Sequence, residues 1–329
     1  MNVLVPLATV VGLFLLGFFG AASGMGWAFG VVFPYIAIAL FLGGLTWRVV
    51  GWASSPVPFR IPTTSGQMKS LDWIKQEKLD NPDTTLRVVG RMALEVLLFR
   101  SLLSNTTSEV RGKRKLVYGI ALALWLAAIA MHWSLIVILI RHIRMFVVPV
   151  PSLVTFLQKV EGFHHFGEPV FYITSVVFIL ALGYLLFRRL FVGQVRYISL
   201  LGDYFPLFLL LGIGLSGFWL RHLDRTDLEG VKQLAVGLIT FNPVVPETVA
   251  SLFFAHLFLV CVLLAYFPFS KLTHMGGIFL SPTRNLANNN RAKRHVNPWD
   301  YPVKVHTYAE YEDDLRDKMK GAGIPVERQ

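Results

Sequence analysis

The sequence predicts an all-α, polytopic integral membrane helix bundle with six transmembrane helices. Of its 329 residues, 54% are hydrophobic and only 16% are charged, proportions that are typical of a membrane protein. Several stretches contain about 20 residues with few or no charges, the length that a helix needs to cross a bilayer. The composition and the uncharged stretches predict the fold class, and the distribution of basic residues described below predicts the orientation in the membrane.

The first two predicted spans occupy residues 1–48, whose first charged residue is Arg48. Val3–Gly20 forms the first span, 21–26 a tight turn of small residues, and Trp27–Trp47 the second span. A cleaved signal peptide would begin with basic residues, which are missing here. We therefore expect the first run to be a retained helix.

Residues 49–115 form a long basic segment, and its prolines predict loops at its start. Within it, 83–104 has the periodicity of an amphipathic helix, with Arg87, Arg91 and Glu95 in one stripe. Crossing the membrane would bury these charges. We therefore expect this helix to lie at the inner membrane interface or against a partner.

Residues 116–274 contain the other four predicted spans and form the core of the bundle. These spans are Leu116 to about Val147, Pro169–Phe187, Tyr204–Leu220 and the uncharged run from Thr248 to Ser270. A tail, 275–329, follows them. In this tail, Thr307 and Glu310 form a capping box that predicts a short polar helix near 308–320. So polar a helix is expected to dock on a soluble partner.

The Lys and Arg residues sort by loop and predict the orientation of the chain. The segments 48–115, 188–200 and 271–329 carry 25 of the 31, and basic loops stay on the cytoplasmic side. Both termini are therefore expected in the cytoplasm of a prokaryotic cell, with the chain in its cytoplasmic membrane. The same rule explains the net charge of +11, so no nucleic-acid partner is expected.

Four histidines on two predicted spans are the most specific feature of the sequence. His132 and His142 lie ten residues apart on the third span, and His256 and His274 lie 18 residues apart on the sixth. Ten helical residues cover about 15 Å, whereas 18 make about five turns and cover about 27 Å. Pro268 should kink the sixth helix before His274.

Two histidines on each of two antiparallel helices can hold two haems edge-on, with each iron bound from both sides. Antiparallel packing pairs His132 with His274, the inner pair, and His142 with His256, the outer pair. A single intramembrane histidine is more often a satisfied core residue, but matched pairs at opposite depths favour haem iron. Because Cys261 is the one cysteine, haem c attachment is excluded and two haem b groups are expected.

Two other classes of function remain open at this point. A six-helix transporter or proton channel would use its intramembrane histidines as a proton relay, but it would also spread ionisable residues along one pathway, and the spans hold few. A haem-free membrane anchor for soluble subunits is the second alternative. A redox difference spectrum separates both from a haem protein.

Several segments resemble the gamma, cytochrome b subunit of respiratory nitrate reductase. These are HLFLVCVLLAYFPFSKLTH (256–274), RRLF followed by VR and GD (188–203), FPYIAIALFLGG (33–44), and the histidines at 132 and 142. The N-terminal span, the 49–115 insert with SSPVPFRIPTTSGQ and the long tail are instead similar to DsrM, the membrane cytochrome of the DsrMKJOP complex of sulfur-metabolising microbes.

The resemblance implies a membrane dihaem cytochrome b, the electron-transfer subunit of a quinol-oxidising or quinone-reducing complex. It would exchange electrons between menaquinol and a cytoplasmic iron–sulfur subunit related to heterodisulfide reductase, together with other membrane and periplasmic redox subunits. A nitrate reductase-type gamma subunit is the alternative assignment. Arg188 and Arg189 fall on the basic pair that meets an inner haem propionate in the nitrate reductase family.

The quinol site is expected at the outer pair, beside the 149–169 loop. An amphipathic headgroup needs an apolar slot with a few titratable partners, and this loop offers phenylalanines among charged residues and histidines. Lys159 and His164 are the candidates for quinol proton transfer. The lysine of the nitrate reductase family's quinol site does not align cleanly with Lys159, because the loop differs in length.

Overall fold

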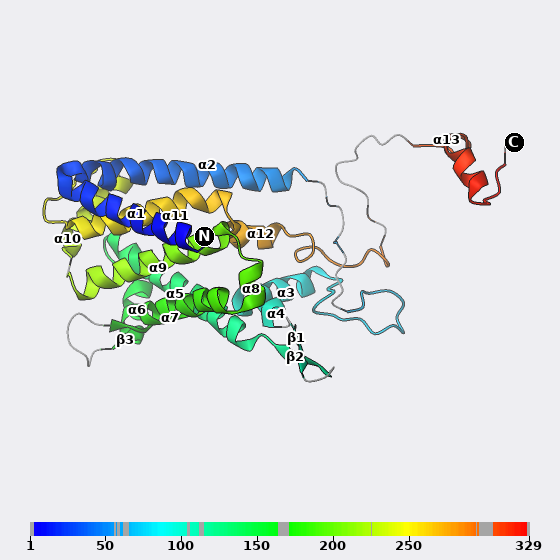
Figure 1. The fold of residues 1–329 in the computed structure, drawn as a ribbon, viewed down its shortest axis with the longest axis horizontal. Helices are drawn as coiled ribbons and strands as arrows, with labels where there is room; N and C mark the ends of the chain where they lie inside the picture. Colours follow the sequence, from blue (N-terminus) through cyan, green and yellow to red (C-terminus); the bar gives the residue numbers. More distant parts are fainter. Residues whose placement is uncertain are drawn as a thin grey trace.

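The computed structural model is a bundle of six long helices (Figure 1). A smaller part lies at one end and contains residues 60–61, 66–103 and 281–289; it is called the polar part below. The structure describes residues 3–55, 57, 60–61, 66–103, 106–111, 115–163, 171–224, 226–293, 295 and 305–327. Within these residues six helices are long and apolar enough to cross a membrane, as predicted: Leu4–Met25, Ala28–Ala53, Leu122–Met145, Ile173–Phe191, Leu201–His222 and Ser251–Phe269. The all-α polytopic bundle is therefore confirmed.

The first two spans form a helical hairpin. Helix α1 (Leu4–Gly20) and helix α2 (Phe33–Ala53) are joined by two π-helical turns, η1 (Ala21–Met25) and η2 (Ala28–Val32). Gly24 in the first turn has a φ of 93°, a conformation that glycine adopts without the steric cost of a Cβ. The predicted turn of small residues is therefore where the chain reverses.

The histidine-bearing helices belong to different packing groups. Helix α5 (Leu122–His142) packs mainly against α7 (Ile173–Phe191), whereas α11 (Ser251–Tyr266) packs against α1, α2 and α9 (Leu201–His222). Contacts between α7 and α9 join the two groups. Buried apolar side chains on α1, α9 and α11 form part of the core: Val10, Leu209 and Leu259. The helices α5 and α11 are thus held in one bundle mainly through α7 and α9.

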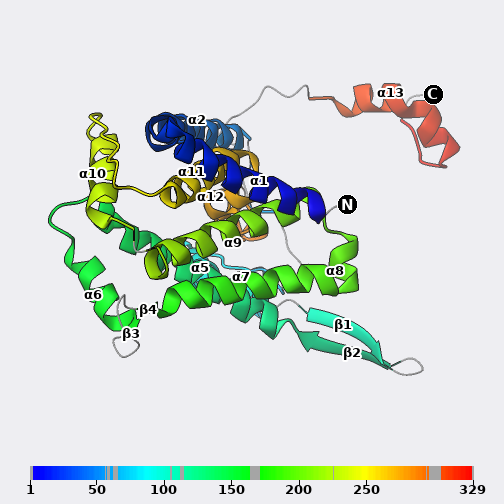
Figure 2. The same ribbon diagram turned by 60° about the vertical axis from the view of Figure 1, so that its left-hand side comes forward.

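Short elements cover the two ends of the bundle (Figure 2). One end holds α6 (Ser152–Glu161) and α10 (Leu228–Ile239), a helix between the fifth and sixth spans. The other end holds α8 (Gly193–Tyr197) and α12 (His274–Leu280). The N-terminus and the tail helix α13 (Tyr308–Gly321) both lie toward the α8–α12 end. Thr307 and Glu310 form the predicted capping box of α13.

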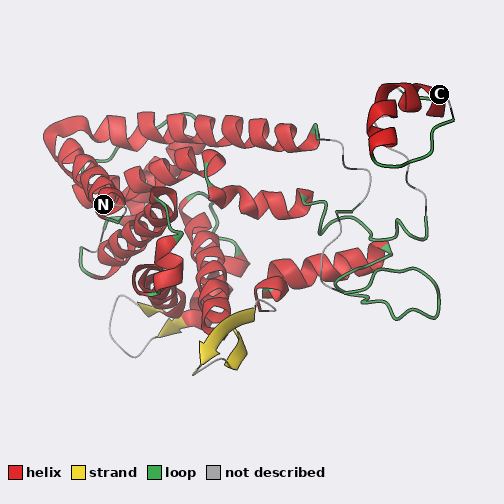
Figure 3. Ribbon diagram, turned by 45° about the vertical axis from the view of Figure 1, so that its right-hand side comes forward, coloured by secondary structure: helices red, strands yellow, loops and turns green. Residues whose placement is uncertain are grey.

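Two short strand pairs correct the predicted starts of two spans (Figure 3). Strand β1 (Thr106–Arg111) pairs with β2 (Lys115–Ile120), so the third span begins at Leu122 and not at Leu116. The β2 sequence KLVYGI is rich in residues that favour strands. Strand β3 (Gly162–Phe163) pairs with β4 (Phe171–Tyr172), so the fourth span begins at Ile173.

The polar part joins the predicted 49–115 segment to the start of the predicted tail, 275–329. Helix α3 (Thr85–Leu98) buries Arg91 and Glu95, and α4 (Arg100–Leu103) follows it. Arg91 donates to the carbonyl of Asp80, and Arg284 lies 3.2 Å from Glu95. Burial lowers the pKa of Arg91, and the negative charge of Glu95 opposes this effect.

The start of the tail is bound to the segment before α3. Asn288 donates from its side chain to Asn81 at 2.7 Å and from its backbone to the carbonyl of Pro82 at 2.6 Å. Arg60, almost fully buried, donates to the carbonyl of Thr283 at 2.8 Å. Arg91 and Glu95 of the charged stripe predicted on 83–104 therefore face these segments, whereas the apolar Leu86 and Val89 are exposed.

Candidate functional site

The four histidines lie on three helices. Helix α5 carries His132 and ends at His142, α11 carries His256, and His274 is the first residue of α12. The prediction of one kinked helix from His256 to His274 is wrong. Two 3₁₀ turns, η4 (Phe267–Phe269) and η5 (Lys271–Thr273), separate α11 from α12. Pro268 in the first turn cannot donate a backbone hydrogen bond, and Ser270 between the turns is extended.

The structure brings His132 and His274 together. Their ring centroids are 5.9 Å apart and the ring planes make an angle of 79°. A metal bound about 2 Å from one nitrogen of each imidazole places the two centroids about 6 Å apart. The predicted inner pair therefore has the separation that two axial ligands of one iron require.

The second predicted pair lies at the other end of the bundle. His142 is the last residue of α5, and His256 lies in the second turn of α11. His256 faces α9, where a Cβ on Gly217 would lie 3.1 Å from its Cε1 atom. Both ends of the bundle thus hold one histidine of the α5 side and one of the α11–α12 side, in the pairing expected from antiparallel helices.

Hydrogen bonds orient all four rings in the same way. His132, His142 and His274 use Nδ1 to bind backbone carbonyls of Ala128, Ile138 and Lys271 at 2.8, 2.7 and 2.8 Å. His256 uses Nδ1 to bind the Ser216 hydroxyl at 2.9 Å.

A carbonyl oxygen only accepts hydrogen bonds, so Nδ1 carries the proton in the three carbonyl-bound rings, and Nε2 has a free lone pair. Within the described part of the chain, no hydrogen bond of the four rings uses Nε2. This is the tautomer and orientation of histidines that bind metals.

His132 of the inner pair also contacts the junction between α3 and α4. Phe99, which has a φ of 50° between α3 and α4, packs edge-on to His132 with centroids 4.9 Å apart. Trp125 and Trp133 of α5 donate to the carbonyls at the end of α3 at 2.7 and 3.1 Å. No pattern in the sequence predicts these contacts, since they join segments about 30 residues apart through single side chains.

Charged residues surround the same end of the bundle. Arg189 donates to Ser199 at 2.8 Å and lies 3.7 Å from Asp203, and Asp203 accepts from Lys271 at 2.7 Å. The Lys271 carbonyl in turn binds His274. Arg188 makes no hydrogen bond or ion pair within the described residues. Of the two predicted arginines, Arg189 is thus bound to neighbouring side chains, while Arg188 is available to an added acidic group.

A buried ion pair lies beside His142 at the other end. Arg141 Nε is 3.0 Å from Glu161 Oε1, and each residue is 7% exposed. Arg141 also donates to Thr174 and Ser175 at 3.1 Å each and lies 3.9 Å above the Tyr172 ring. The pair fixes α6 against α5 and α7.

The predicted quinol-site residues lie in and after α6. Lys159 is exposed on this helix, and His164 lies outside the described residues. Among the described residues of the loop, Glu161 is the titratable one that is buried against the bundle. Val154 and Glu161 are both buried and lie seven residues apart, a helical repeat that could have placed Glu161 on the inner face from the sequence alone.

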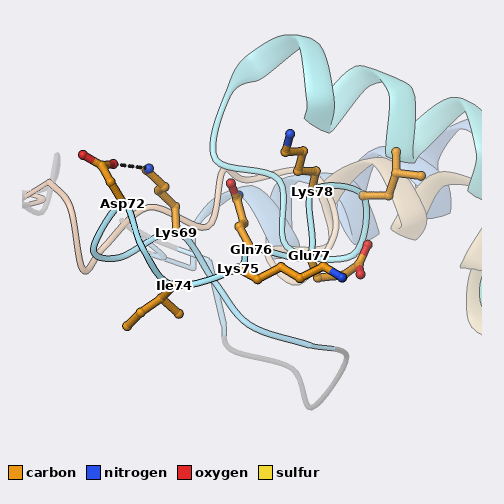
Figure 4. Close-up of a pocket in the computed structure, with 8 residues that line it drawn as sticks. Lys69, Asp72, Ile74, Lys75, Gln76, Glu77 and Lys78 are labelled. Carbon is orange, nitrogen blue, oxygen red and sulfur yellow. Dashed lines mark hydrogen bonds and ion pairs between the residues drawn. The ribbon is translucent and has the colours of Figure 1, made fainter.

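The described residues contain no group of three or more His, Cys, Asp or Glu side chains that could hold a bare metal ion. A haem needs only two protein ligands, because the macrocycle supplies four nitrogens. An open hollow of about 660 Å³ lies elsewhere, in the loop before α3 (Figure 4). Its Lys69 and Asp72 bind one another at 2.7 Å, and no histidine lines it.

Comparison with known proteins tests the relationship suggested by the histidine spacing. The family described as "Nitrate reductase gamma subunit" matches residues 107–292, which include all four histidines and both arginines. The chain belongs to this family. Helices α1 and α2 lie outside the match.

Two curated relatives extend the similarity beyond the matched range. The "Hdr-like menaquinol oxidoreductase cytochrome b-like subunit" of Archaeoglobus fulgidus is 46% identical over 283 residues, which cover 84% of each chain. The protein of the same description from Archaeoglobus profundus is 41% identical over 276 residues, 81% of each chain. This member of the nitrate reductase gamma family is thus similar over most of its length to subunits described as cytochrome b-like.

Proposed function

We propose that the chain is a membrane dihaem cytochrome b that exchanges electrons between the menaquinone pool and a cytoplasmic iron–sulfur subunit of a respiratory complex. His132 with His274 would bind the inner haem b, and His142 with His256 the outer one. The relatives described as subunits of an Hdr-like menaquinol oxidoreductase support the quinone and the heterodisulfide reductase-like partner. The DsrM-like segments favour dissimilatory sulfur metabolism as the setting.

The observation that carries this proposal is the geometry of the histidines. The inner pair has ring centroids 5.9 Å apart, the outer pair lies at the opposite end of the bundle, and all four rings bind hydrogen-bond partners through Nδ1. This leaves Nε2 of each ring to bind iron. Bound haem would supply one-electron chemistry, and the chain would supply its position and redox potential. Arg188 would bind an inner propionate, because it is half-buried and has no protein partner among the described residues.

The quinol site would lie at the outer end, between the His142 end of α5 and α6. Lys159 and His164 remain our candidates for proton transfer. The buried Arg141–Glu161 pair supports the placement, because it holds α6 beside the outer pair. The polar part built by 60–103 and 281–289, at the α8–α12 end with both termini, would face the cytoplasm and bind the iron–sulfur subunit.

A redox difference spectrum of the purified protein tests the proposal. We expect a b-type signal of two haems per chain. His256→Ala should remove the outer haem alone and His274→Ala the inner haem alone, because each iron loses one of its two protein ligands. A spectrum without haem would favour the transporter or the haem-free anchor. If either variant kept both haems with unaltered spectra, the pairing would be wrong.

Two further measurements test the site and the orientation. Lys159→Ala or His164→Ala should slow haem reduction by a menaquinol analogue without loss of either haem. Wild-type reduction rates in both variants would remove the quinol site from this loop. Reporters fused at both termini should be found in the cytoplasm, and reporters on opposite sides of the membrane would refute the six-span orientation.

A further inference from the structure

His256 differs from the other three histidines in the group that orients its ring. His132, His142 and His274 are held by backbone carbonyls three or four residues earlier in their own segments. His256 is held by the Ser216 hydroxyl of another helix, α9, at 2.9 Å. Its hydrogen bond is therefore the one of the four that a side-chain substitution can remove.

The geometry of Ser216 defines its role in this contact. Its hydroxyl lies 2.7 Å from the Gly212 carbonyl and 3.1 Å from the Ile213 carbonyl, and the side chain is 6% exposed. Because the hydroxyl has one proton, donating it to a carbonyl leaves its lone pairs to accept from Nδ1–H of His256. The buried serine can thus accept from Nδ1–H of His256, and in that tautomer Nε2 is the donor atom.

The next residue of α9 lies against the Cε1 edge of the same ring. A Cβ on Gly217 would lie 3.1 Å from Cε1 of His256 and 3.6 Å from Nδ1. The α9 backbone is therefore in close contact with the imidazole, and the ring can tilt toward α9 only by pushing this helix away. Ser216 and Gly217 together restrict the ring.

We propose that Ser216 is the positioning residue that sets the donor strength of His256 and thereby the redox potential of the outer haem. This inference rests on the proposed function, because it requires a haem bound by His142 and His256. A hydrogen bond accepted from Nδ1–H makes the imidazole a stronger donor to iron. Stronger donation stabilises the oxidised iron, so Ser216 lowers the potential of this haem relative to the same site without the bond.

The test compares Ser216→Ala with a matched control, Ser134→Ala. Ser134 of α5 is 3% exposed, and its hydroxyl binds the carbonyls of Ala130 and Met131 at 2.6 and 3.1 Å, as Ser216 binds those of its own helix. Among the described residues, no hydrogen bond joins Ser134 to a histidine ring. The control therefore removes an equivalent buried helix serine without touching a ligand.

The readout is the midpoint potential of each haem, with the outer haem identified as the one lost in His256→Ala. In Ser216→Ala we expect an upward shift of the outer midpoint alone, with both haems retained and the inner midpoint unchanged. Ser216→Thr, which keeps the hydroxyl, should restore the wild-type value. Ser134→Ala should shift neither midpoint.

Other outcomes also decide the question. Loss of the outer haem alone in Ser216→Ala would support the positioning role, because outer-shell changes typically weaken metal binding about 10–100-fold. Unchanged midpoints in Ser216→Ala, equal shifts of both haems, or an equal shift in Ser134→Ala would overturn the inference while leaving the dihaem function intact. A wild-type chain without haem would overturn both.

Discussion

The buried pair of Arg141 and Glu161 makes a quantitative prediction about stability. Glu161→Gln removes the carboxylate but keeps nearly the same volume, so the guanidinium remains buried without its counter-charge. The side chains of the pair are 9% and 8% exposed, which leaves little solvent to replace the lost partner. The hydroxyl of Thr174, which donates to Glu161, also loses a charged acceptor.

The expected cost follows from what remains around Arg141. Removing one partner of a buried ion pair costs about 3–5 kcal/mol. Two hydroxyls and the ring of Tyr172 still contact the guanidinium, so we expect the lower end, about 3 kcal/mol. A medium-sized protein loses about 2–4 °C per kcal/mol, which corresponds to a fall of roughly 6–12 °C in the unfolding midpoint.

Thermal unfolding of the detergent-solubilised protein, followed by tryptophan fluorescence, measures this change. The double variant Arg141→Met with Glu161→Leu should regain most of the lost stability, because replacing both partners by apolar groups is often neutral. Asp72→Asn, which breaks an exposed pair with Lys69, serves as the control and should leave the midpoint unchanged. A midpoint for Glu161→Gln within the range of this control, or a double variant as unstable as the single one, would refute the reasoning.

Three further predictions concern other parts of the chain. Gly217→Ala should alter the visible spectrum of the outer haem alone, because its Cβ would press on His256. Asp203→Asn breaks the ion pairs that join α9 to α7 and to the turn before α12, and haem release assays should show about tenfold weaker binding of the inner haem alone. A hydrogen bond from Thr248 lowers the pKa of Asp227 below its usual 3.8, so its stabilising effect is full above that value and is lost as pH falls through the lower folded pKa. Thermal unfolding at about pH 6 and pH 3 should therefore show a smaller acid-induced loss in Asp227→Asn than in the wild type.

The six spans could be predicted because a bilayer imposes both length and apolarity on each crossing. Val3–Gly20 and Tyr204–Leu220 were correct to within a few residues, since uncharged runs have clear ends. The predicted start of the third span at Leu116 is wrong, because the apolar residues before Leu122 belong to a strand and not to the span. A short apolar run can be a strand or a helix, and KLVYGI before α5 pairs with β1.

The polar part could not be predicted, because its contacts join distant residues without any period. Asn81 binds Asn288 across about 200 residues, and Arg91 binds a backbone carbonyl, so neither contact leaves a pattern in the sequence. The periodicity of 83–104 did predict helix α3. It could not predict that Arg91 and Glu95 would be buried against other segments of the chain while Leu86 and Val89 are exposed.

The break at Pro268 explains how histidines ten residues apart on one side can pair with histidines 18 residues apart on the other. His132 and His142 are separated by about 15 Å along α5. On the other side, α11 continues for ten residues beyond His256, to Tyr266, which is the same rise of about 15 Å. The eight remaining residues run through two 3₁₀ turns and an extended Ser270, so they redirect the chain instead of extending one straight helix to about 27 Å.

The N-terminal hairpin supports this break. Gly44 of α2 lies so close to it that an added Cβ would be 2.8 Å from Cβ of Pro268, and Phe41 packs against Phe267 with centroids 5.5 Å apart. Helix α2 lies outside the family match of 107–292, yet it holds the turn that brings His274 to His132. In this chain helix α2 is therefore part of the structure that forms the inner pair.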